Sequence, residues 1–212
     1  MTVTEHHIVV PRTARYAMLG TPTTATRSVW FVCHGYAQLA ARFILEFEGV
    51  EDSSTLIVAP EGLSRMYLRN SHGTVGASWM TREDRLNEIE DYVRYLDAVH
   101  DEVIGALGSE DIRVTTLGFS QGTATAGRWI GLGRSVHHRC ILAGGLLPPD
   151  LPYEAYARLP QPLTYVVGTN DPLIDRAALA EQRAMLASLG LESRLVEFEG
   201  AHVIDVATLL TL

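Results

Sequence analysis

The sequence predicts an α/β fold: a mostly parallel central sheet with helices on both faces. Short apolar runs such as Val29–Cys33 and Thr55–Ala59 are typical of strands buried on both sides. Between Arg82 and Leu107, apolar residues recur at steps of three and four along one stripe, which indicates a helix. Strands and helices alternate along the chain, as in parallel sheets. We expect residues 1–212 to form one domain, because α/β chains of this length often stay single.

The N-terminal part differs because it predicts antiparallel pairing. Thr2–Val10 and Arg12–Leu19 have the pattern of two strands joined near Pro11, which would form a hairpin. Leu39–Phe47 is expected to be a short helix. Segment 61–79 contains Gly, Asn and Ser without periodicity, so we expect a long loop there, and long loops in compact domains are usually functional.

The C-terminal half continues the alternation. Asp175 suits the N-cap of a helix and Gly190 the position just past its end. The Gly- and Pro-rich stretch 144–152 predicts a loop. The expected strands are Ile112–Leu117, Arg139–Ala143, Leu163–Val167 and Ser193–Phe198, and the expected helices are Gln121–Leu132, Asp175–Leu189 and Val203–Leu210.

Composition and charge exclude several classes of protein. The net charge of −8 argues against a nucleic-acid partner, which would need a basic face. No stretch approaches the length of a membrane span, and the N-terminus lacks the features of a secretory signal, so we expect a cytoplasmic protein.

Cys33 and Cys140 lie inside apolar runs and should be buried free thiols. The sequence leaves a homodimer open.

The most informative motif is Gly118-Phe119-Ser120-Gln121-Gly122. It follows an apolar, β-branched run and precedes small residues that can open a helix. A G-x-S-x-G pentapeptide between a strand and a helix is typical of the nucleophile elbow of a serine hydrolase. We therefore expect Ser120 to be exposed at the carboxyl end of the sheet. The alternative is that Ser120 is only a helix N-cap.

An activated serine needs a base and an acid that orients this base, and on such a fold they follow in the order Ser, Asp or Glu, His. Asp171 and His202 satisfy this order, and each lies just past an expected strand. We expect His202 to take the Ser120 proton and Asp171 to hold the imidazole. Asp171 could instead be a turn residue before Pro172, with Asp175 as a competitor, and His202 a surface histidine.

The oxyanion hole needs two backbone donors. The N–H group of Gln121, the residue after the nucleophile, is the first candidate. The second should come from the loop His34–Gln38 after an earlier strand, where we favour Tyr36 and then Ala37. His34 itself should hold this loop rather than act as a base.

We expect no metal and no cofactor. The pairs His6-His7 and His137-His138 are adjacent, and adjacent side chains in a strand point to opposite faces, which suits one metal ion badly. No zinc, dinucleotide or P-loop motif occurs in the sequence.

Together these motifs resemble the carboxylesterase/phospholipase-type esterases of the α/β-hydrolase superfamily, the group that includes acyl-protein thioesterases. The matching pieces run in the family's order from about Trp30 to the C-terminus: His34-Gly35, Ala59-Pro60-Glu61-Gly62, Ser78-Trp79, the elbow, Gly168-Thr169-Asn170-Asp171-Pro172 and Gly200-Ala201-His202. The resemblance implies a cap-less α/β-hydrolase fold, a triad of Ser120, Asp171 and His202, and an oxyanion hole from Tyr36 and Gln121.

Two segments depart from this pattern. Tyr36-Ala37-Gln38 stands where family members usually carry smaller residues, and Arg65–Arg69 differs from thioesterases. These departures concern the substrate rather than the chemistry. The expected substrate contacts on the rim are Tyr36, Tyr67, Trp79, Leu146, Leu147, Leu173 and Val203, and ordinary loop packing explains each of them equally well.

The leading hypothesis is a serine hydrolase that cleaves carboxylic esters, or thioesters, through an acyl-Ser120 intermediate. The chain has little length for a lid, so we expect an accessible site that takes small-molecule esters of short to medium acyl chains. One alternative is an acyltransferase that uses the same acyl-enzyme. Another is a non-catalytic protein that binds a ligand on this fold, although the intact Ser, Asp, His order argues against it.

Overall fold

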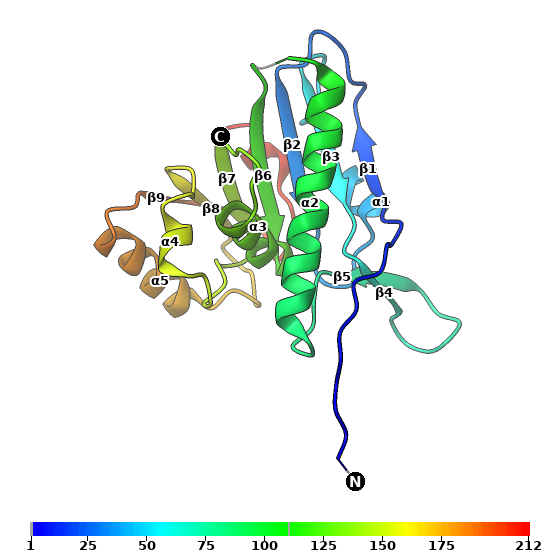
Figure 1. The fold of residues 1–212 in the computed structure, drawn as a ribbon. Coiled ribbons are helices and arrows are strands. Elements are labelled where there is room, and N and C mark those ends of the chain that lie inside the picture. The colour runs from blue at the N-terminus through cyan, green and yellow to red at the C-terminus, as the bar shows by residue number, and fades with distance from the viewer. Residues whose placement is uncertain (1, 110) are drawn as a thin grey trace.

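In the computed structural model, which describes residues 2–109 and 111–212, a seven-stranded sheet organises the chain (Figure 1). The strand order is β1-β3-β2-β6-β7-β8-β9, and every neighbouring pair is parallel except β1 and β3. The strands are β1 Tyr16–Leu19, β2 Ser28–Cys33, β3 Thr55–Pro60, β6 Arg113–Phe119, β7 Arg139–Ala143, β8 Leu163–Gly168 and β9 Ser193–Phe198. The predicted parallel sheet is confirmed.

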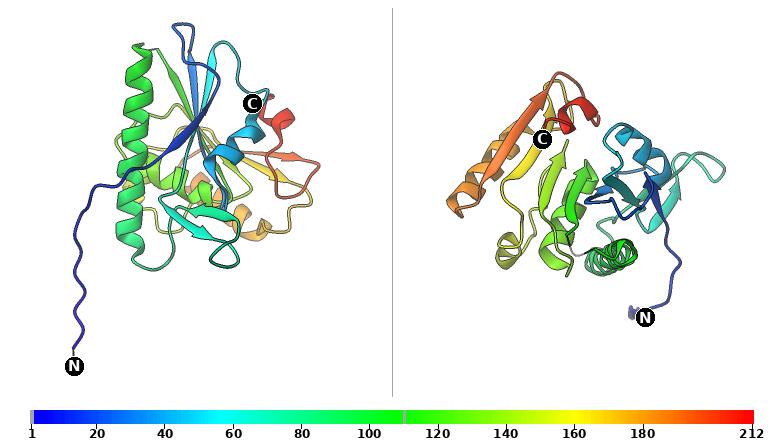
Figure 2. Two further views of the ribbon diagram at one scale, coloured as in Figure 1. Left: turned by 90° about the vertical axis from the view of Figure 1, so that its right-hand side faces the viewer. Right: turned by 90° about the horizontal axis from the view of Figure 1, so that it is seen from above.

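Helices cover both faces of this sheet, as predicted (Figure 2). Strand residues alternate between the two faces, so Phe31 packs toward α2 and α3 whereas Val32 packs toward α1. One face carries α2 Arg85–Leu107, α3 Gln121–Leu132, α4 Tyr153–Tyr156 and α5 Arg176–Ser188, and the other carries α1 Ala40–Phe43, the 3-10 turn η1 Ile44–Phe47 and α6 Val206–Leu209.

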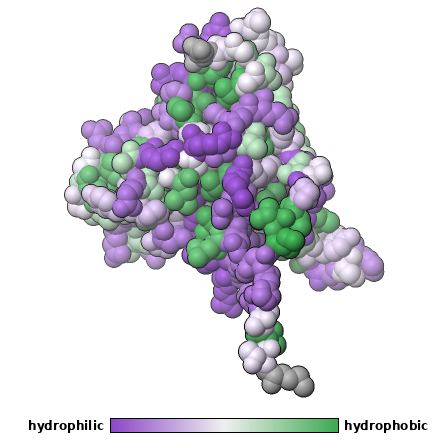
Figure 3. All heavy atoms as spheres, viewed as in Figure 1, coloured by the Kyte–Doolittle hydropathy of each residue, from purple (hydrophilic) through white to green (hydrophobic). Residues whose placement is uncertain are grey.

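The N-terminal pairing is antiparallel, but its partner differs from the prediction. Tyr16–Leu19 pairs with β3, with Tyr16 opposite Pro60, and Thr2–Val10 is not a strand. These first residues leave the body of the molecule as an extended arm (Figure 1). Figure 3 shows apolar surface along the arm, to which Val3, Ile8, Val9 and Val10 contribute exposed side chains. Strand propensity alone does not form a strand where no neighbour pairs with it.

The segment 61–79, expected to be a loop, contains a small antiparallel hairpin of β4 Ser64–Tyr67 and β5 Val75–Ser78. Each strand has only four residues, which is too short for alternation to stand out in the sequence. The last helix also starts later than expected, at Val206, because the side chain of Asp205 accepts the Thr208 N–H group. The short helix α4, just after the expected loop 144–152, was not predicted.

The expectations for Asp175, Gly190 and the two cysteines are confirmed. Asp175 caps α5 by accepting the N–H groups of Ala177 and Ala178, and Gly190 adopts a φ of +75° just past its end. Cys33 and Cys140 are buried free thiols, and burial raises the pKa of Cys140 to about 12. Within the described residues, none of the helices combines the length and hydropathy that a bilayer span would need.

Candidate active site

Ser120 lies at the carboxyl edge of the sheet, between the end of β6 and the start of α3. Its backbone has φ +53° and ψ −116°, a conformation that costs a non-glycine residue about 1–3 kcal/mol. Its hydroxyl makes no capping hydrogen bond to α3, so the alternative that Ser120 is only a helix N-cap finds no support. The side chain is instead left for another partner.

The two elbow glycines allow this tight turn. A Cβ atom on Gly118 would lie 2.2 Å from the carbonyl oxygen of Gly122. A Cβ atom on Gly122 would lie 2.0 Å from the carbonyl oxygen of Cys33, at the end of β2. Because both obstacles are backbone atoms, α3 can start this close to two strands only if both residues are glycine.

His202 and Asp171 form the hydrogen-bonded pair that a base and its orienting acid require. The distance from His202 Nδ1 to Asp171 Oδ2 is 2.8 Å. The Asp171 side chain is 1% exposed and that of His202 is 17% exposed, so the carboxylate is buried and the imidazole reaches the surface. With Nδ1–H donating to the carboxylate, Nε2 is left free to accept a proton.

The loops after β8 and β9 bring this pair together. Asn170 N–H donates to the Gly200 carbonyl oxygen over 2.8 Å, which joins the two loops beside the pair. The second oxygen of Asp171, Oδ1, accepts the Leu173 N–H group over 2.9 Å. Asp175, the competing carboxylate, is occupied as the cap of α5, which leaves Asp171 as the acid of the candidate site.

The imidazole of His202 packs on Phe119, the residue directly before Ser120. Their ring centroids are 4.8 Å apart, and Gly144 lies so close that a Cβ there would be 3.0 Å from His202 Cε1. In the described ranges, no hydrogen bond joins Ser120 to His202. Catalytic hydrogen bonds are often long without substrate and tighten when it binds, so the two residues remain candidate partners.

The loop after β2 presents the second candidate oxyanion donor. Ala37 N–H donates to the Ala77 carbonyl oxygen over 2.9 Å, so this group is already used. In the part of the chain that the structure describes, the neighbouring Tyr36 N–H has no such acceptor. Gln121 opens α3, where N–H groups have no partner within the helix. Tyr36 and Gln121 therefore remain the candidate donors, with Ala37 excluded.

His34 holds this loop through both ring nitrogens. Its Nε2 accepts the Gly62 N–H group over 2.9 Å, so the ring is neutral and Nδ1–H donates to the Gly35 carbonyl oxygen over 2.7 Å. Burial lowers the pKa of His34, which favours this neutral form. The ring has no free nitrogen with which to act as a base.

The structure places the expected rim residues in two groups. Tyr36, Tyr67, Leu173 and Val203 are between 50% and 70% exposed, and Leu146 is half-buried. Trp79 and Leu147 are 1% and 2% exposed, so their expected substrate contacts are not available in this structure. Trp79 is buried because its ring stacks on His34 and its Nε1–H donates to the His34 carbonyl oxygen.

Glu61 is a residue of this region to which sequence reasoning gave no role. It is 2% exposed, and it accepts hydrogen bonds from Arg15, Arg65 and the Ala40 N–H group. Burial alone would raise the pKa of Glu61, but these partners hold it below its usual value. The only signal in the sequence was the segment Ala59–Gly62, in which a charged residue directly follows an apolar strand.

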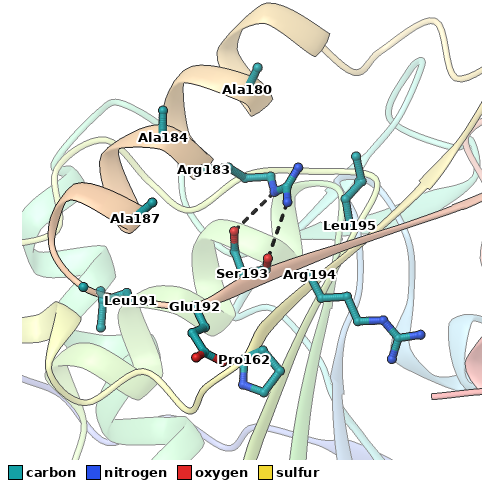
Figure 4. Close-up of a pocket in the computed structure, with 11 residues that line it drawn as sticks. Pro162, Ala180, Arg183, Ala184, Ala187, Leu191, Glu192, Ser193, Arg194 and Leu195 are labelled. Atoms are coloured by element: carbon teal, nitrogen blue, oxygen red, sulfur yellow. Dashed lines mark hydrogen bonds between the residues drawn. The ribbon is translucent and has the colours of Figure 1, made fainter.

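One groove of the molecule lies outside this site. A groove of about 940 Å³ separates α5 from β9, where Arg183 bonds Ser193 (Figure 4), and it contains none of the candidate catalytic residues. Among the described residues, no three His, Cys, Asp or Glu side chains are grouped so that they could hold a metal ion.

The fold and the elbow define a serine hydrolase of the α/β-hydrolase type. The chain belongs to the serine hydrolase family FSH1, whose family model matches residues 34–207. Among curated proteins, the comparison finds no match.

Solved structures with the same fold include esterases and thioesterases. Esterase PE8 is 23% identical, with a TM-score of 0.70, over 93% of this chain and 95% of that one. The Bacillus cereus carboxylesterase is 15% identical, with a TM-score of 0.64, over 93% and 91%. Zea mays acyl-protein thioesterase 2 is 16% identical, with a TM-score of 0.66, over 94% and 98%. At these identities the likeness concerns the fold.

Proposed function

We propose that this serine hydrolase cleaves carboxylic esters of short to medium acyl chains through an acyl-Ser120 intermediate. The observation that carries the proposal is a serine in a strained backbone conformation at the carboxyl edge of the sheet, whose hydroxyl does not cap α3. The residue before it, Phe119, packs on a histidine that a buried carboxylate orients. A helix cap or a surface histidine requires neither the strain nor the carboxylate.

In the acylation step, His202 Nε2 takes the proton of Ser120 as its oxygen attacks the ester carbonyl. The carbonyl oxygen becomes an oxyanion, to which the Tyr36 and Gln121 N–H groups donate. The positive charge on the imidazolium is stabilised by Asp171, through the 2.8 Å contact with Nδ1. Collapse of the tetrahedral intermediate breaks the ester bond, and His202 returns the proton to the departing alcohol.

In the deacylation step, His202 takes a proton from water, which attacks the acyl-Ser120 carbonyl. The same two N–H groups bind the second oxyanion, and the proton then returns to Ser120 as the carboxylic acid leaves. A thiol can replace the alcohol as leaving group without changing any of these roles. An alcohol in place of water would give acyl transfer.

The preference for shorter acyl chains rests on the exposed side of the site. Leu173 and Val203 flank the Asp171–His202 pair in sequence and are 70% and 50% exposed. Such side chains offer an acyl group a partial apolar contact rather than full burial. Long chains would gain little further burial, and short soluble esters should therefore turn over at least as well.

The test compares wild type with Ser120→Ala for labelling by a fluorophosphonate probe and for turnover of a p-nitrophenyl ester series. We expect labelling to disappear and turnover to fall by about 10⁴-fold or more in Ser120→Ala. Unchanged turnover in Ser120→Ala, or no labelling of folded wild type, would refute the proposal. Faster turnover of long-chain esters would refute only the chain-length preference, and product analysis with added alcohol separates hydrolysis from acyl transfer.

A further inference from the structure

The two candidate oxyanion donors come from distant parts of the chain. One short segment nevertheless contacts both the loop that carries Tyr36 and the side chain of Gln121. Tyr36 belongs to the loop after β2, and Gln121 opens α3. Segment 76–80, which covers the end of β5 and the two residues after it, lies against both. We call this segment the brace.

On the Tyr36 side, the brace pairs with the loop as a strand would. Ala37 N–H donates to the Ala77 carbonyl oxygen over 2.9 Å, and Ala77 N–H donates to the Gln38 carbonyl oxygen over 3.2 Å. These bonds hold Ala37 at a φ of +66°, a conformation that residues other than glycine rarely adopt. The peptide unit that carries the Tyr36 N–H group is therefore fixed from its C-terminal side.

Gly76 sets how closely the brace and the loop approach. A Cβ atom at this position would lie 2.3 Å from the Ala37 carbonyl oxygen and 2.8 Å from its carbonyl carbon. Both are backbone atoms, so a side chain at position 76 would have to move the loop or the brace. Gly73 gives a contrast within the same hairpin: the nearest atom to its Cβ would be Asn70 Oδ1, at 3.2 Å, and the nearest backbone atom, the Asn70 carbonyl oxygen, would be at an ordinary contact distance of 3.6 Å.

On the Gln121 side, the contact is made by the side chain rather than the backbone donor. Gln121 Nε2 donates to Ser78 Oγ over 3.1 Å and to the Met80 carbonyl oxygen over 3.0 Å. Gln121 Oε1 accepts the Trp79 N–H group over 3.3 Å. These three bonds tie the first residue of α3 to the brace.

The brace is itself anchored in the core. Trp79 is 1% exposed and stacks on His34 with a centroid distance of 4.9 Å. Ser78 Oγ–H donates to the Met80 carbonyl oxygen over 3.0 Å, which closes the turn after β5. A segment buried and bonded in this way can transmit position from one donor to the other.

We propose that residues 76–80 position the oxyanion hole by holding its two donors in a fixed relation, with Gly76 and the Gln121 side chain as positioning groups. This inference rests on the proposed function. Neither group touches the reacting atoms, and both act through the backbone N–H groups of Tyr36 and Gln121. Because misplacing such a donor by about 1 Å can reduce turnover by about 10²-fold, the effect should be large.

The test compares four variants with wild type: Gly76→Ala, Gln121→Met, the double variant, and Gly73→Ala as the matched control. Gln121→Met keeps the backbone donor and the side-chain length but loses the three bonds to the brace. Each is assayed for kcat and KM with a short p-nitrophenyl ester. Inhibition by a short alkyl boronic acid is also measured, because its tetrahedral adduct on Ser120 places an oxygen in the hole.

We expect Gly76→Ala and Gln121→Met to lower kcat, by up to about 10²-fold, with KM nearly unchanged and boronate affinity reduced in proportion. Gly73→Ala should match wild type. The double variant should lose less than the product of the two single effects, because each change disrupts the same unit. The pH profile of kcat/KM should keep its shape, since the His202–Asp171 pair is not altered.

Wild-type kcat and boronate affinity in either folded single variant would overturn the proposal, as would strictly multiplicative effects in the double variant. If Gly76→Ala does not fold, Gln121→Met decides, because it adds no bulk at the contact. Absence of Ser120-dependent turnover in wild type would instead refute the proposed function, and the brace with it. A thermal shift without any kcat change would indicate a structural role only.

Discussion

The two sides of the candidate active site differ in how firmly they are held. On the oxyanion side, the loop after β2 is bonded to the brace, and the brace is bonded to the Gln121 side chain at the start of α3. His34 ties the same loop to Gly62. On the opposite side, Leu173 and Val203 are 70% and 50% exposed and contribute no such network of side-chain bonds. The groups expected to stabilise charge are thus held in place by hydrogen bonds, whereas the side chains expected to contact the acyl group are not.

This difference separates the part of the site that is expected to carry the chemistry from the part that is expected to select the acyl group. Oxyanion stabilisation depends on donors that need no reorganisation during the reaction. Selection among acyl groups depends on graded apolar contact, which exposed side chains supply. Substitutions on the oxyanion side should therefore lower kcat, whereas substitutions on the exposed side should change kcat/KM by an amount that depends on the acyl chain.

The largest effect is expected at the acid that orients the base. Asp171→Asn keeps the shape of the side chain but favours the wrong imidazole tautomer, so kcat should fall by about 10⁴-fold. Steady-state kinetics with a short p-nitrophenyl ester measures this. Asp175→Asn, which alters only a helix cap, serves as the control and should keep kcat. A small effect of Asp171→Asn would remove the buried carboxylate from the mechanism.

The stability of the oxyanion side should depend on Glu61, which accepts hydrogen bonds from Arg15, Arg65 and the first residue of α1. Glu61→Gln removes charge-assisted hydrogen bonds and should lower the free energy of unfolding by about 1–3 kcal/mol. Urea denaturation at pH 7 measures this. Because the pKa of Glu61 is lowered in the folded state, its contribution exists above the unfolded-state pKa and is lost as the pH falls through the folded one. Equal stability of wild type and Glu61→Gln at pH 7 would contradict this account.

Acid should weaken the fold through histidines that are kept neutral. Burial lowers the pKa of His137 to about 3, with a further contribution from His100, and burial also lowers the pKa of His34. In the unfolded chain these groups take up a proton near pH 6.5, whereas in the folded chain they do not. The free energy of unfolding should therefore decrease as the pH falls from about 6.5 toward 3.

Urea denaturation at a series of pH values checks this prediction. His137→Gln should reduce the slope of stability against pH, because it removes one of the buried neutral groups. The matched control is His72→Gln at an exposed position, which should leave the slope unchanged. The same slope in His137→Gln as in wild type would exclude His137 as a contributor.

The smallest effects are expected on the exposed side. Leu173→Ala and Val203→Ala should change kcat/KM by less than about tenfold, because each residue can offer only part of its surface to an acyl group. The change should be larger for a hexanoate than for an acetate ester, and the melting temperature should stay the same. Equal effects on both esters would show that neither residue contacts the acyl chain.

The sequence was informative where local chemistry decides the structure. The elbow strand and helix, the cap at Asp175 and the alternation of buried strands all follow from turn, capping and periodicity signals within a few residues. Ser120, Asp171 and His202 could be expected at one edge of the sheet because each follows a parallel strand, and parallel strands end at the same edge.

What the sequence did not reveal depends on contacts between distant residues. The strands of the hairpin β4–β5 are too short for their alternation to be visible in the sequence. The contact of this hairpin with the loop after β2, through Ala77 and Ala37, joins residues that are distant in sequence. Trp79 was expected on the rim, because no sequence signal shows that His34 lies beneath its ring. The predicted partner of β1 was also wrong, because the sequence pattern does not show that β1 pairs with β3, a strand distant in sequence.

The positive φ of Ser120 also bears on how this family member can change over time. A chain that keeps one residue in an unfavourable backbone conformation has a smaller reserve of stability, by about 1–3 kcal/mol, against every later mutation. Substitutions elsewhere that improve packing would restore this reserve. Because of the strain at the elbow, the number of substitutions that the exposed side can tolerate depends on how well the core is packed, although the core does not contact the substrate.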